Sequence, residues 1–501
     1  MPDSRLIQTV LIAIAAFFSI SAQPQPSLKA RLDAAIAKSP ALASAFVGIR
    51  VVSLPDGRVL YEHDANLLFA PASNTKLFTT ALALTTLGPQ YKFITTVRAE
   101  QPLDSSGRLS GDLIFVGGGD PSMSPRKYPY QAPSPDQRPQ PFSTIGAIED
   151  LADQLKARGL TSITGDIVGD DSRYRWEPYP DGWSANDAVW EYGAPVSSLI
   201  VNDNAFTLWI RPGAQPGDLA RIQTFPSMCT LLINNRIVTT SDGERKIDED
   251  RGIGSRELQA WGMIPVGDAG IDELLAVDDP AVFAAAMLRD ALVRRGVVVH
   301  GEAAARHRFE NETTDANAAP GIELARRVSP PLAELLQVVD KVSQNLHAEA
   351  MLREVGFVKR NNGSREAGQE EMQAFLSRAG IAASEYHLVD GSGLSRLTLV
   401  SPTAITKLLA FMYRSNLRDA WIPLLPIAGV DGTLRTRFEG HPEAKRIQAK
   451  TGSLSHVRAM SGYAESQAFG PLAFSFMVND SIAASHDISA FLDTMGLKLI
   501  E

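Results

Sequence analysis

The chain has 501 residues, 44% of them hydrophobic and 21% charged, and its 48 lysines and arginines against 57 aspartates and glutamates give a net charge of −9. This composition excludes a mainly disordered or collagen-like chain, and the acidic balance argues against nucleic acid as the main partner, because phosphate binding needs a basic surface. The length predicts about three domains, and the single cysteine, Cys229, excludes an intrachain disulfide and a cysteine-based metal site.

The first predicted element is apolar: residues 6–20 follow Arg5 and precede the small residues around Ser21 and Ala22. About 15 apolar residues are too few to span a bilayer comfortably, but they suit the core of a signal peptide. We interpret residues 1–22 as a signal peptide cleaved after Ser21 or Ala22, and we expect an exported protein in the periplasm. A buried or membrane-anchoring helix is the alternative. Later apolar runs fall short of about 18 residues, so we expect membrane association to be peripheral at most.

The elements that follow combine a helix, a hairpin and a second helix. Residues 27–37 are predicted to be helical, and residues 45–53 and 59–62 flank a Pro-Asp-Gly turn and are predicted to form a β-hairpin. Residues 74–87 show a helical apolar pattern that Gly88 and Pro89 end.

The middle of the chain is predicted to be rich in short strands. These are residues 113–116, 163–168, 206–210, 222–225 and 231–238. Residues 121–142 contain seven of the 31 prolines, which favours a loop over a helix or a central strand.

From Pro330 the pattern becomes helical again. Five apolar side chains share one helix face there: Leu332, Leu335, Leu336, Val339 and Val342. A second helix is predicted over residues 344–355 and a last one over residues 488–495, with strands at 446–450, 460–465 and 472–478. The two ends of the chain are therefore α+β, and the strand-rich middle separates them.

The first motif that suggests chemistry is Ser73-Asn74-Thr75-Lys76, at the start of a predicted helix. Residues three apart share a helix face, so Lys76 can reach the Ser73 hydroxyl. The free N–H groups of a helix start also favour developing negative charge. This arrangement suits a serine nucleophile with a lysine base. A similar pattern from Ser124 to Lys127 lies in the proline-rich loop without a helix behind it, and we dismiss it.

Two further motifs complete a set. Ser343-Gln344-Asn345 lies at a joint between two predicted helices, and Lys450-Thr451-Gly452-Ser453 lies on a predicted strand. Each motif alone is weak, since Ser184-Ala185-Asn186 also matches the second. The three in this order and context are typical of active-site-serine penicillin-binding proteins and class A β-lactamases.

With these motifs the chain resembles the D-alanyl-D-alanine carboxypeptidase/endopeptidase family, the class C low-molecular-mass penicillin-binding proteins. The resemblance extends over nearly the whole mature chain, through residues 117–122, 165–172, 192–199 and 390–396. It implies an α+β multi-domain fold, in which a β-lactamase/transpeptidase-like serine domain, an antiparallel sheet flanked by helices, is interrupted by a strand-rich insertion. The implied boundaries are 23–92 and 322–501 for the catalytic domain, 93–208 and 285–321 for inserted domain II, and 209–284 for nested domain III.

The resemblance also implies roles for the motif residues. Ser73 attacks the carbonyl of the penultimate D-Ala, and Lys76 accepts its proton, which requires a neutral amine. Burial and the nearby cation of Lys450 would both lower the pKa of Lys76. Ser343 relays a proton to the leaving amine, and Asn345 holds the substrate amide and Lys76.

Other residues are expected to bind the substrate. The resemblance implies that Lys450, Thr451, Gly452 and Ser453 hold the terminal carboxylate, and that the backbone N–H groups of Ser73 and Ser453 form the oxyanion hole. Arg396 aligns with a position lining the pocket for the peptide side chain, and Asp171 is a second candidate for that pocket. Each has a plainer alternative: Ser73 a helix cap, Arg396 a salt-bridged loop arginine, Asp171 a turn aspartate.

We therefore expect an exported serine DD-peptidase that acts on peptidoglycan stem peptides, removing terminal D-Ala, cutting D-Ala–diaminopimelate cross-links, or both, and that β-lactams inhibit covalently. A β-lactamase is the nearest rival, but the sequence between the first two motifs contains no Glu-x-x-x-Asn pattern. A non-catalytic peptidoglycan-binding or β-lactam-sensing module would show an altered nucleophile or base, and both are intact. No cofactor or metal is expected, because the eight histidines form no ligand motif. The oligomeric state stays open.

Overall fold

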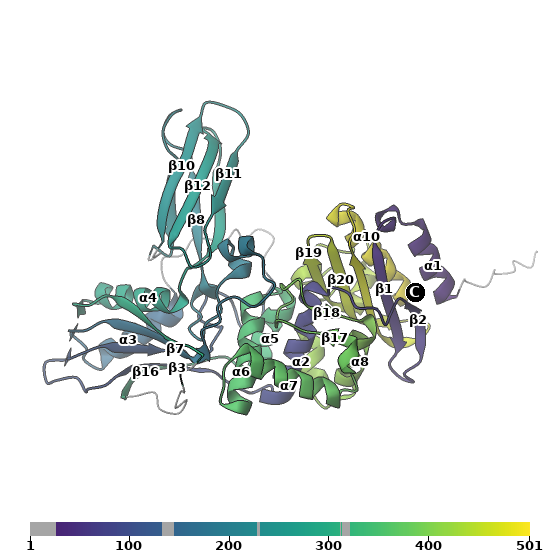
Figure 1. The fold of residues 1–501 in the computed structure, drawn as a ribbon, viewed down its shortest axis with the longest axis horizontal. Helices are drawn as coiled ribbons and strands as arrows, with labels where there is room; N and C mark the ends of the chain where they lie inside the picture. Colours follow the sequence, from purple (N-terminus) through teal and green to yellow (C-terminus); the bar gives the residue numbers. More distant parts are fainter. Residues whose placement is uncertain (1–26, 133–144, 228–230, 311, 313–320) are drawn as a thin grey trace, which may run out of the picture.

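The computed structural model describes residues 27–132, 145–227, 231–310, 312 and 321–501. The interpretation of residues 1–22 as a signal peptide and the single cysteine, Cys229, lie outside these residues. The chain forms three parts (Figure 1). Both ends of the chain build one lobe, which contains the three motifs and is called the catalytic lobe. The middle of the chain builds an inserted lobe beside it, and a finger of strands within residues 205–276 projects from the inserted lobe. Within the described part of the chain, no helix is both long and apolar enough to cross a bilayer.

The catalytic lobe is centred on a five-stranded antiparallel sheet in the order β19-β20-β21-β1-β2. Its strands are β19 (Ile447–Leu454), β20 (Val457–Ser466), β21 (Gly470–Asn479), β1 (Phe46–Ser53) and β2 (Val59–His63). β1 pairs with β21 from Phe46 opposite Asn479 to Ser53 opposite Leu472. The two ends of the chain therefore share one sheet.

Helices cover both faces of this sheet. The helices α1 (Leu28–Lys38) and α10 (Ser485–Ile500) pack with the sheet in one apolar core. The opposite face packs against a layer that contains α2 (Lys76–Leu87), α5 (Leu332–Lys341), α6 (Asn345–Arg360), α7 (Arg365–Arg378) and α8 (Pro402–Arg414). α2 is enclosed by this layer, which explains why nearly all of its residues are apolar or small.

The inserted lobe has its own five-stranded mixed sheet, β15-β7-β5-β3-β16. The strands are β15 (Ala303–Arg308), β7 (Ile167–Arg175), β5 (Leu113–Val116), β3 (Ile94–Ala99) and β16 (Ile322–Val328). The helices α3 (Gly146–Ala157) and α4 (Pro280–Arg294) pack into the same core. Three two-residue strands, β4 (Arg108–Leu109), β6 (Ser162–Ile163) and β14 (Val298–Val299), form a small sheet beside it.

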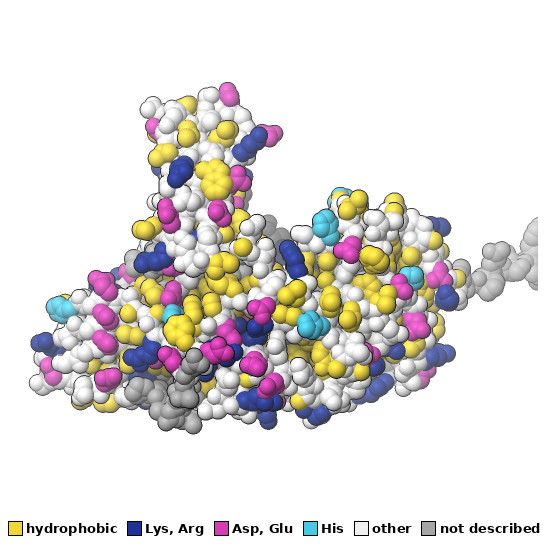
Figure 2. All heavy atoms as spheres, viewed as in Figure 1, with side chains coloured by type: hydrophobic (Ala, Val, Ile, Leu, Met, Phe, Trp, Pro, Cys, Tyr) yellow, Lys and Arg dark blue, Asp and Glu magenta, His cyan; other side chains and the backbone are white. Residues whose placement is uncertain are grey.

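The finger is built from two three-stranded sheets. One contains β13 (Ile271–Ala276), β8 (Ala205–Arg211) and β9 (Arg221–Phe225), and the other contains β10 (Leu232–Thr240), β12 (Glu257–Pro265) and β11 (Lys246–Asp250). Buried side chains from both sheets share one core with the inserted lobe. Figure 2 shows acidic and basic side chains mixed over the visible face of the molecule rather than gathered by sign.

Most predicted elements are confirmed, as is the α+β multi-domain fold with an antiparallel sheet flanked by helices. Three differences have physical reasons. Residues 163–168 form two strands rather than one, because the turn between β6 and β7 bonds to Gly111 through Gly165 N–H. The middle also contains α3 and α4, so it is less purely stranded than expected. Several elements were not predicted, among them the helices α7 and α8 and the strands β3, β11, β12, β13, β15 and β16. The strand β11 contains a single apolar residue in its sequence Lys-Ile-Asp-Glu-Asp.

The boundary between the lobes also differs from the expected one. β16 begins at Ile322, where the sequence placed the second half of the catalytic domain, but it pairs with β3 in the sheet of the inserted lobe. We propose that the catalytic lobe resumes after Val328, at the helix α5.

Because β1 joins both chain ends, its core residues should control the stability of the catalytic lobe. Ile49 is fully buried and lies opposite Phe476 of the paired strand β21. We expect Ile49→Ala to lower the free energy of unfolding by about 2–5 kcal/mol, because the cavity left behind adds to the lost transfer energy. Urea denaturation followed by tryptophan fluorescence measures this.

The matched control is Val59→Ala in the neighbouring strand β2, where the side chain is 38% exposed. A surface change of this kind should cost less than about 1 kcal/mol. Equal losses for the two variants would contradict the central position of β1.

Candidate active site

Ser73 lies in a 3₁₀ turn, Ala72–Thr75, that leads directly into α2. The regular α-helix begins at Lys76 rather than at Asn74, yet the tight turn keeps the two side chains together: Lys76 Nζ lies 3.0 Å from Ser73 Oγ. Ala72 has a positive φ of 47°, an uncommon backbone conformation for a residue with a side chain. The turn packs closely against the backbone of Gly393 and Gly452. Any side chain at these positions would clash with it, because a Cβ on Gly393 would lie 1.9 Å from Ala72 O and one on Gly452 would lie 2.4 Å from Pro71 O.

Lys76 is the best-connected side chain of the site. It is fully buried, and besides Ser73 its Nζ donates to Asn345 Oδ1 at 2.6 Å and to the backbone oxygen of Ser392 at 2.7 Å. Asn345 is the first residue of α6, and its Nδ2 donates to Tyr192 O of the inserted lobe at 2.8 Å. The insertion therefore orients one of the groups that hold the lysine.

A second lysine–serine pair faces the first. Lys450 on β19 is fully buried, and its Nζ lies 2.9 Å from Ser343 Oγ and donates to Thr451 O at 2.8 Å. Ser343 occupies the joint between α5 and α6 with a positive φ of 68°. The structure thus brings Ser73, Lys76, Ser343, Asn345 and Lys450 into one cluster from three separate stretches of the chain.

The electrostatics of the cluster favour a neutral Lys76. Burial lowers the pKa of Lys76 well below its usual value, and the charge of Lys450 lowers it further, which are the two causes expected from the sequence. Burial also lowers the pKa of Lys450 to about 8, and Asp340 opposes that shift. Asp340 lies at the end of α5 and is fully buried, so its own pKa is raised to about 7.

Asp340 is a site residue that the sequence analysis missed. The only signal was an aspartate in the last turn of an amphipathic helix, three positions before Ser343. Motif matching gives such a residue no weight, because its effect depends on burial beside two lysines.

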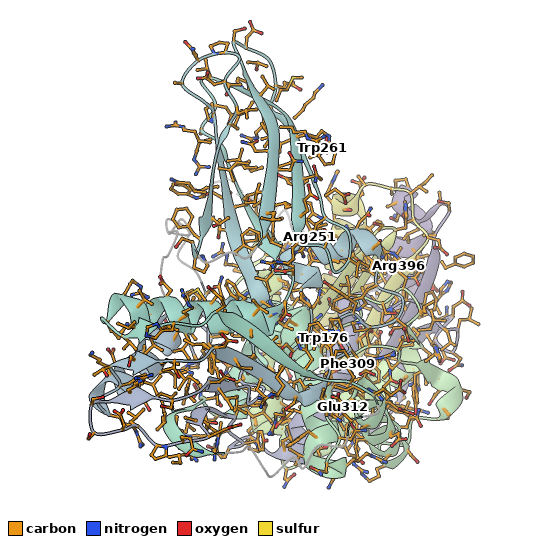
Figure 3. The ribbon with its side chains drawn as sticks, turned by 60° about the vertical axis from the view of Figure 1, so that its left-hand side comes forward. Trp176, Arg251, Trp261, Phe309, Glu312 and Arg396 are labelled. Atoms are coloured by element: carbon orange, nitrogen blue, oxygen red, sulfur yellow. The ribbon has the colours of Figure 1, made fainter. Side chains whose placement is uncertain are left out.

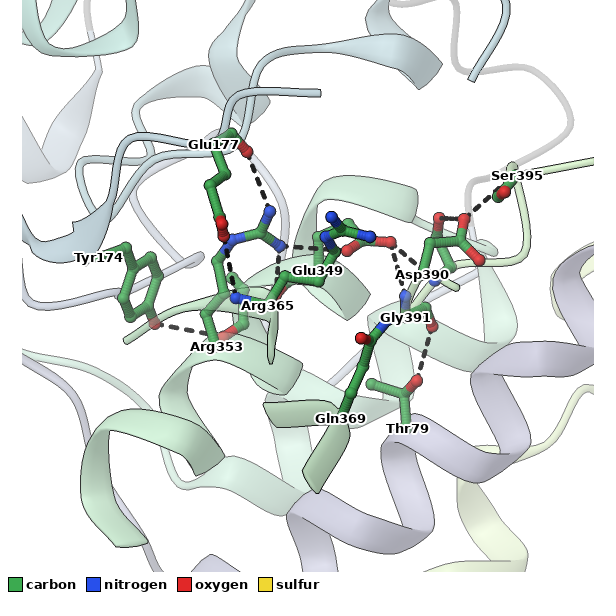
Figure 4. A network of polar contacts seen from close by, with 12 residues as sticks. Thr79, Tyr174, Glu177, Glu349, Arg353, Arg365, Gln369, Asp390, Gly391 and Ser395 are labelled. Carbon is green, nitrogen blue, oxygen red and sulfur yellow. Dashed lines mark hydrogen bonds and ion pairs between the residues drawn. The ribbon is translucent and has the colours of Figure 1, made fainter. Parts of the chain in front are cut away.

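A second missed feature supports the Ser392 carbonyl (Figure 4). Glu349 Oε1 accepts the backbone N–H groups of Gly391 and Ser392 at 2.8 and 2.9 Å, and Thr79 Oγ1 donates to Gly391 O at 2.6 Å. Arg353 forms an ion pair with Glu349 at 3.1 Å. A glutamate and an arginine four residues apart in a buried helix were the available sequence signal. This network fixes the carbonyl oxygen that accepts from Lys76.

The remaining motif residues belong to β19, the edge strand of the sheet. Gly452 is buried against the serine turn, with its Cβ position 3.2 Å from Ser73 N, while Ser453 is exposed and Thr451 Oγ1 donates to Thr433 Oγ1 at 2.7 Å. The strand β19 therefore runs directly beside Ser73. In the described part of the chain, no group of three or more His, Cys, Asp or Glu side chains is placed to hold a metal ion.

Arg396 and Asp171 are not brought together. Asp171 is buried in β7, where it accepts from Ser197 Oγ at 2.8 Å and lies 2.9 Å from His307 Nδ1. His307 stacks on Trp176, and Figure 3 shows Trp176 and Phe309 on the inserted lobe with Arg396 apart from them. These contacts give Asp171 a structural environment, and its substrate role stays a prediction.

Arg396 and Asp187 both lie close enough to Tyr192 to act on its pKa, which burial and Asp187 raise and Arg396 lowers. Tyr192 is also the residue whose backbone oxygen holds Asn345. Arg396 is exposed, and no ion pair joins it to another residue that the structure describes, so both its substrate role and its plainer alternative stay predictions.

Comparisons with known proteins point to one family. The family model for D-Ala-D-Ala carboxypeptidase 3 (S13) matches residues 28–497. A D-alanyl-D-alanine carboxypeptidase of Actinomadura sp. (strain R39) is 32% identical over 486 residues, covering 95% of this chain and 85% of that protein. The D-alanyl-D-alanine carboxypeptidase DacB of Haemophilus influenzae is 25% identical over 448 residues, covering 86% and 85%.

The fold is similar to two solved structures of penicillin binding protein 4 (dacB) from Haemophilus influenzae. The first has a TM-score of 0.78 at 24% identity and covers 93% of this chain and 97% of that chain. The second, complexed with a β-lactam, has a TM-score of 0.75 at 22% identity and covers 94% and 99%.

The two lysines predict a bell-shaped pH profile for acylation by penicillin. The rate should rise with pH as Lys76 loses its proton, and it should fall as Lys450 becomes neutral near pH 8. Asp340→Asn removes a carboxylate that raises the pKa of both lysines, and because Asp340 has a pKa of about 7, we expect the alkaline limb of the profile to move to lower pH. The second-order acylation rate between about pH 5 and about pH 10 measures this.

Asp487→Asn, on an exposed position of α10, is the matched control and should leave the profile in place. An unchanged profile in Asp340→Asn would show that Asp340 does not act on the lysines.

Proposed function

The chain belongs to the D-Ala-D-Ala carboxypeptidase 3 (S13) family, and we propose that it hydrolyses the D-Ala-D-Ala termini of peptidoglycan stem peptides through an acyl-enzyme on Ser73. The observation that carries this proposal is the pair of lysine–serine contacts, Lys76 with Ser73 and Lys450 with Ser343. A base beside the nucleophile and a proton donor beside the leaving group are what acyl transfer requires.

In the acylation step, Ser73 Oγ attacks the carbonyl carbon of the penultimate D-Ala while neutral Lys76 takes the hydroxyl proton. The backbone N–H groups of Ser73 and Ser453 stabilise the oxyanion. The amide bond then breaks, Ser343 passes its hydroxyl proton to the leaving amine of the terminal D-Ala, and the proton held by Lys76 returns to Ser343, which leaves Lys76 neutral. Water subsequently attacks the ester while Lys76 accepts a proton from it, and Lys76 gives that proton to Ser73 Oγ as the ester bond breaks.

Two groups of residues bind the substrate, one on each side of the scissile bond. The side of the leaving group is formed by Lys450, Thr451, Gly452 and Ser453, where the free carboxylate meets a buried cation and strand donors. On the acyl side, Tyr192, Asp187 and Arg396 offer a carboxylate and a guanidinium to the peptide side chain. β-Lactams present the same carbonyl and carboxylate, so they acylate Ser73 and inhibit.

Cleavage of D-Ala–diaminopimelate cross-links is proposed as a second activity, because the acyl half is identical and only the leaving amine differs. We also propose that the protein is exported, most plainly to the periplasm, on the apolar pattern of residues 6–20 and the location of its substrate outside the cytoplasm.

The test is to incubate the purified protein with a fluorescent penicillin and with a D-Ala-D-Ala peptide. Ser73→Ala should lose stable labelling and reduce D-Ala release by at least about 10³-fold, because the nucleophile is gone. The matched control is Ser124→Ala, in the proline-rich segment whose Ser-x-x-Lys pattern we dismissed, and it should keep both.

Other outcomes separate the rival functions. Rapid turnover of penicillin would indicate a β-lactamase, and labelling without peptide hydrolysis would indicate a sensor. Absence of both reactions in the unmodified protein would contradict an acyl-serine mechanism.

A further inference from the structure

A short segment of the catalytic lobe lies along the outer side of the edge strand β19. Ala449 N of β19 donates to Pro426 O of this segment at 2.9 Å. The segment then leads into the 3₁₀ turn Gly432–Leu434. The turn therefore follows backbone that is hydrogen-bonded to the strand containing Thr451, one of the residues proposed to bind the carboxylate of the leaving D-Ala.

A buried ion pair fixes the position of this turn. Lys341 Nζ donates to Asp431 Oδ2 at 2.6 Å, and Asp431 Oδ1 accepts from Ile427 N at 2.8 Å. Gly432 has a φ of 57°, and a Cβ there would lie 2.7 Å from Lys341 O, so the turn can approach α5 closely only with a glycine at this position. Because Lys341 lies two residues before Ser343, the end of α5 that leads to the proton donor also positions the turn.

The turn presents one hydroxyl group to β19. Thr451 Oγ1 donates to Thr433 Oγ1 at 2.7 Å. Threonine hydroxyls in turns commonly bond to nearby backbone groups. Within the residues that the structure describes, however, Thr433 Oγ1 has no other hydrogen bond. The hydroxyl of Thr433 is therefore paired with Thr451 rather than with its own turn, and its own proton has no acceptor.

The protons of these two hydroxyls determine how Thr451 can bind a carboxylate. A hydroxyl has one proton to donate, and an ionised carboxylate only accepts. Thr451 gives its proton to Thr433, so it can donate to the carboxylate of the leaving D-Ala only after that proton has turned away. Thr433 can then donate its own proton to Thr451. Because hydrogen bonds in a chain polarise one another, this second bond strengthens the bond from Thr451 to the carboxylate.

We propose that Thr433 is a positioning residue for the leaving-group carboxylate: its hydroxyl changes from acceptor to donor when substrate binds, and it thereby favours substrates with a free terminal carboxylate. The proposal rests on the acyl-enzyme function above, because that function places the carboxylate at Thr451. A hydrogen bond to a charged acceptor is roughly twice as strong as one between neutral groups. The support from Thr433 should therefore matter for a carboxylate and matter little for a neutral terminus.

The experiment compares a peptide that ends in D-Ala-D-Ala with the same peptide ending in D-Ala-D-alaninamide. We expect Thr433→Val to lower kcat/KM for the free carboxylate about tenfold, equivalent to about 1.4 kcal/mol, and to lower it for the amide less than about twofold. The loss should appear chiefly as a higher KM, because the bond is made in the bound substrate and in the transition state alike. Thr433→Ser keeps the hydroxyl and should restore most of the loss.

A pair of penicillins repeats the comparison at the acylation step. Penicillin has a free carboxylate, whereas its methyl ester does not. We expect Thr433→Val to lower the second-order acylation rate constant for penicillin about tenfold and that for the ester less than about twofold. This pair makes the test independent of the rate at which the peptide amide is hydrolysed.

Thr494→Val is the matched control, because it makes the same substitution at an exposed position of α10. This helix packs on the face of the sheet opposite α2, and the Thr494 hydroxyl donates to Ala490 O of its own helix at 2.9 Å. The control should leave both substrate preferences in place. Active enzyme is counted from the end point of penicillin labelling, so a folding loss cannot imitate the effect.

The outcomes separate this proposal from the one it rests on. Failure of the unmodified enzyme to release D-Ala from the peptide would contradict the proposed function. Equal losses for both members of a pair in Thr433→Val, or no recovery in Thr433→Ser, would show that Thr433 only holds the turn. Those results, or unchanged rates in Thr433→Val, would overturn the positioning role and leave the acyl-enzyme function in place.

Discussion

The amines of Lys76 and Lys450 are buried in one small cluster, and the surrounding structure must stabilise them without water. Burying an amine in its charged form is costly unless partners replace water. Lys76 meets the requirement with three oxygen contacts, from Ser73, Asn345 and Ser392, and with a lowered pKa. The same condition that makes burial tolerable, a neutral amine, is the condition that makes Lys76 a base for Ser73.

The partners of these lysines come from distant parts of the chain. The site therefore forms only when both ends of the chain have folded into the catalytic lobe. α2 supplies Lys76 near the N-terminus, α6 supplies Asn345, and β19 supplies Lys450 near the C-terminus. The pairing of β1 with β21 unites the two ends in one sheet, and glycines at positions 393 and 452 let neighbouring backbone approach the serine turn without a clash.

The inserted lobe contributes to the site as well as to its surroundings. Tyr192 O receives a hydrogen bond from Asn345, and Trp183 Nε1 donates to Asp390 at 3.1 Å beside the segment that holds Lys76. An ion pair between Arg173 and Glu354 joins β7 to α6. The insertion therefore takes part in positioning the groups around Lys76.

The sequence by itself determined the α+β fold class, the helices and strands that carry the three motifs, and the order of these motifs, because these depend on local periodicity and on residues three or four positions apart. It also led to the expectation that burial and Lys450 lower the pKa of Lys76. It could not identify Asp340, Glu349 or Tyr192 as supporting groups, or show that Asp187 and Arg396 both act on Tyr192. Those distinctions depend on which side chains are buried and which oxygens face them. Contacts such as Lys76 with Asn345 and with Ser392 join residues about 270 to 320 positions apart, at which range only the tertiary structure decides proximity and desolvation.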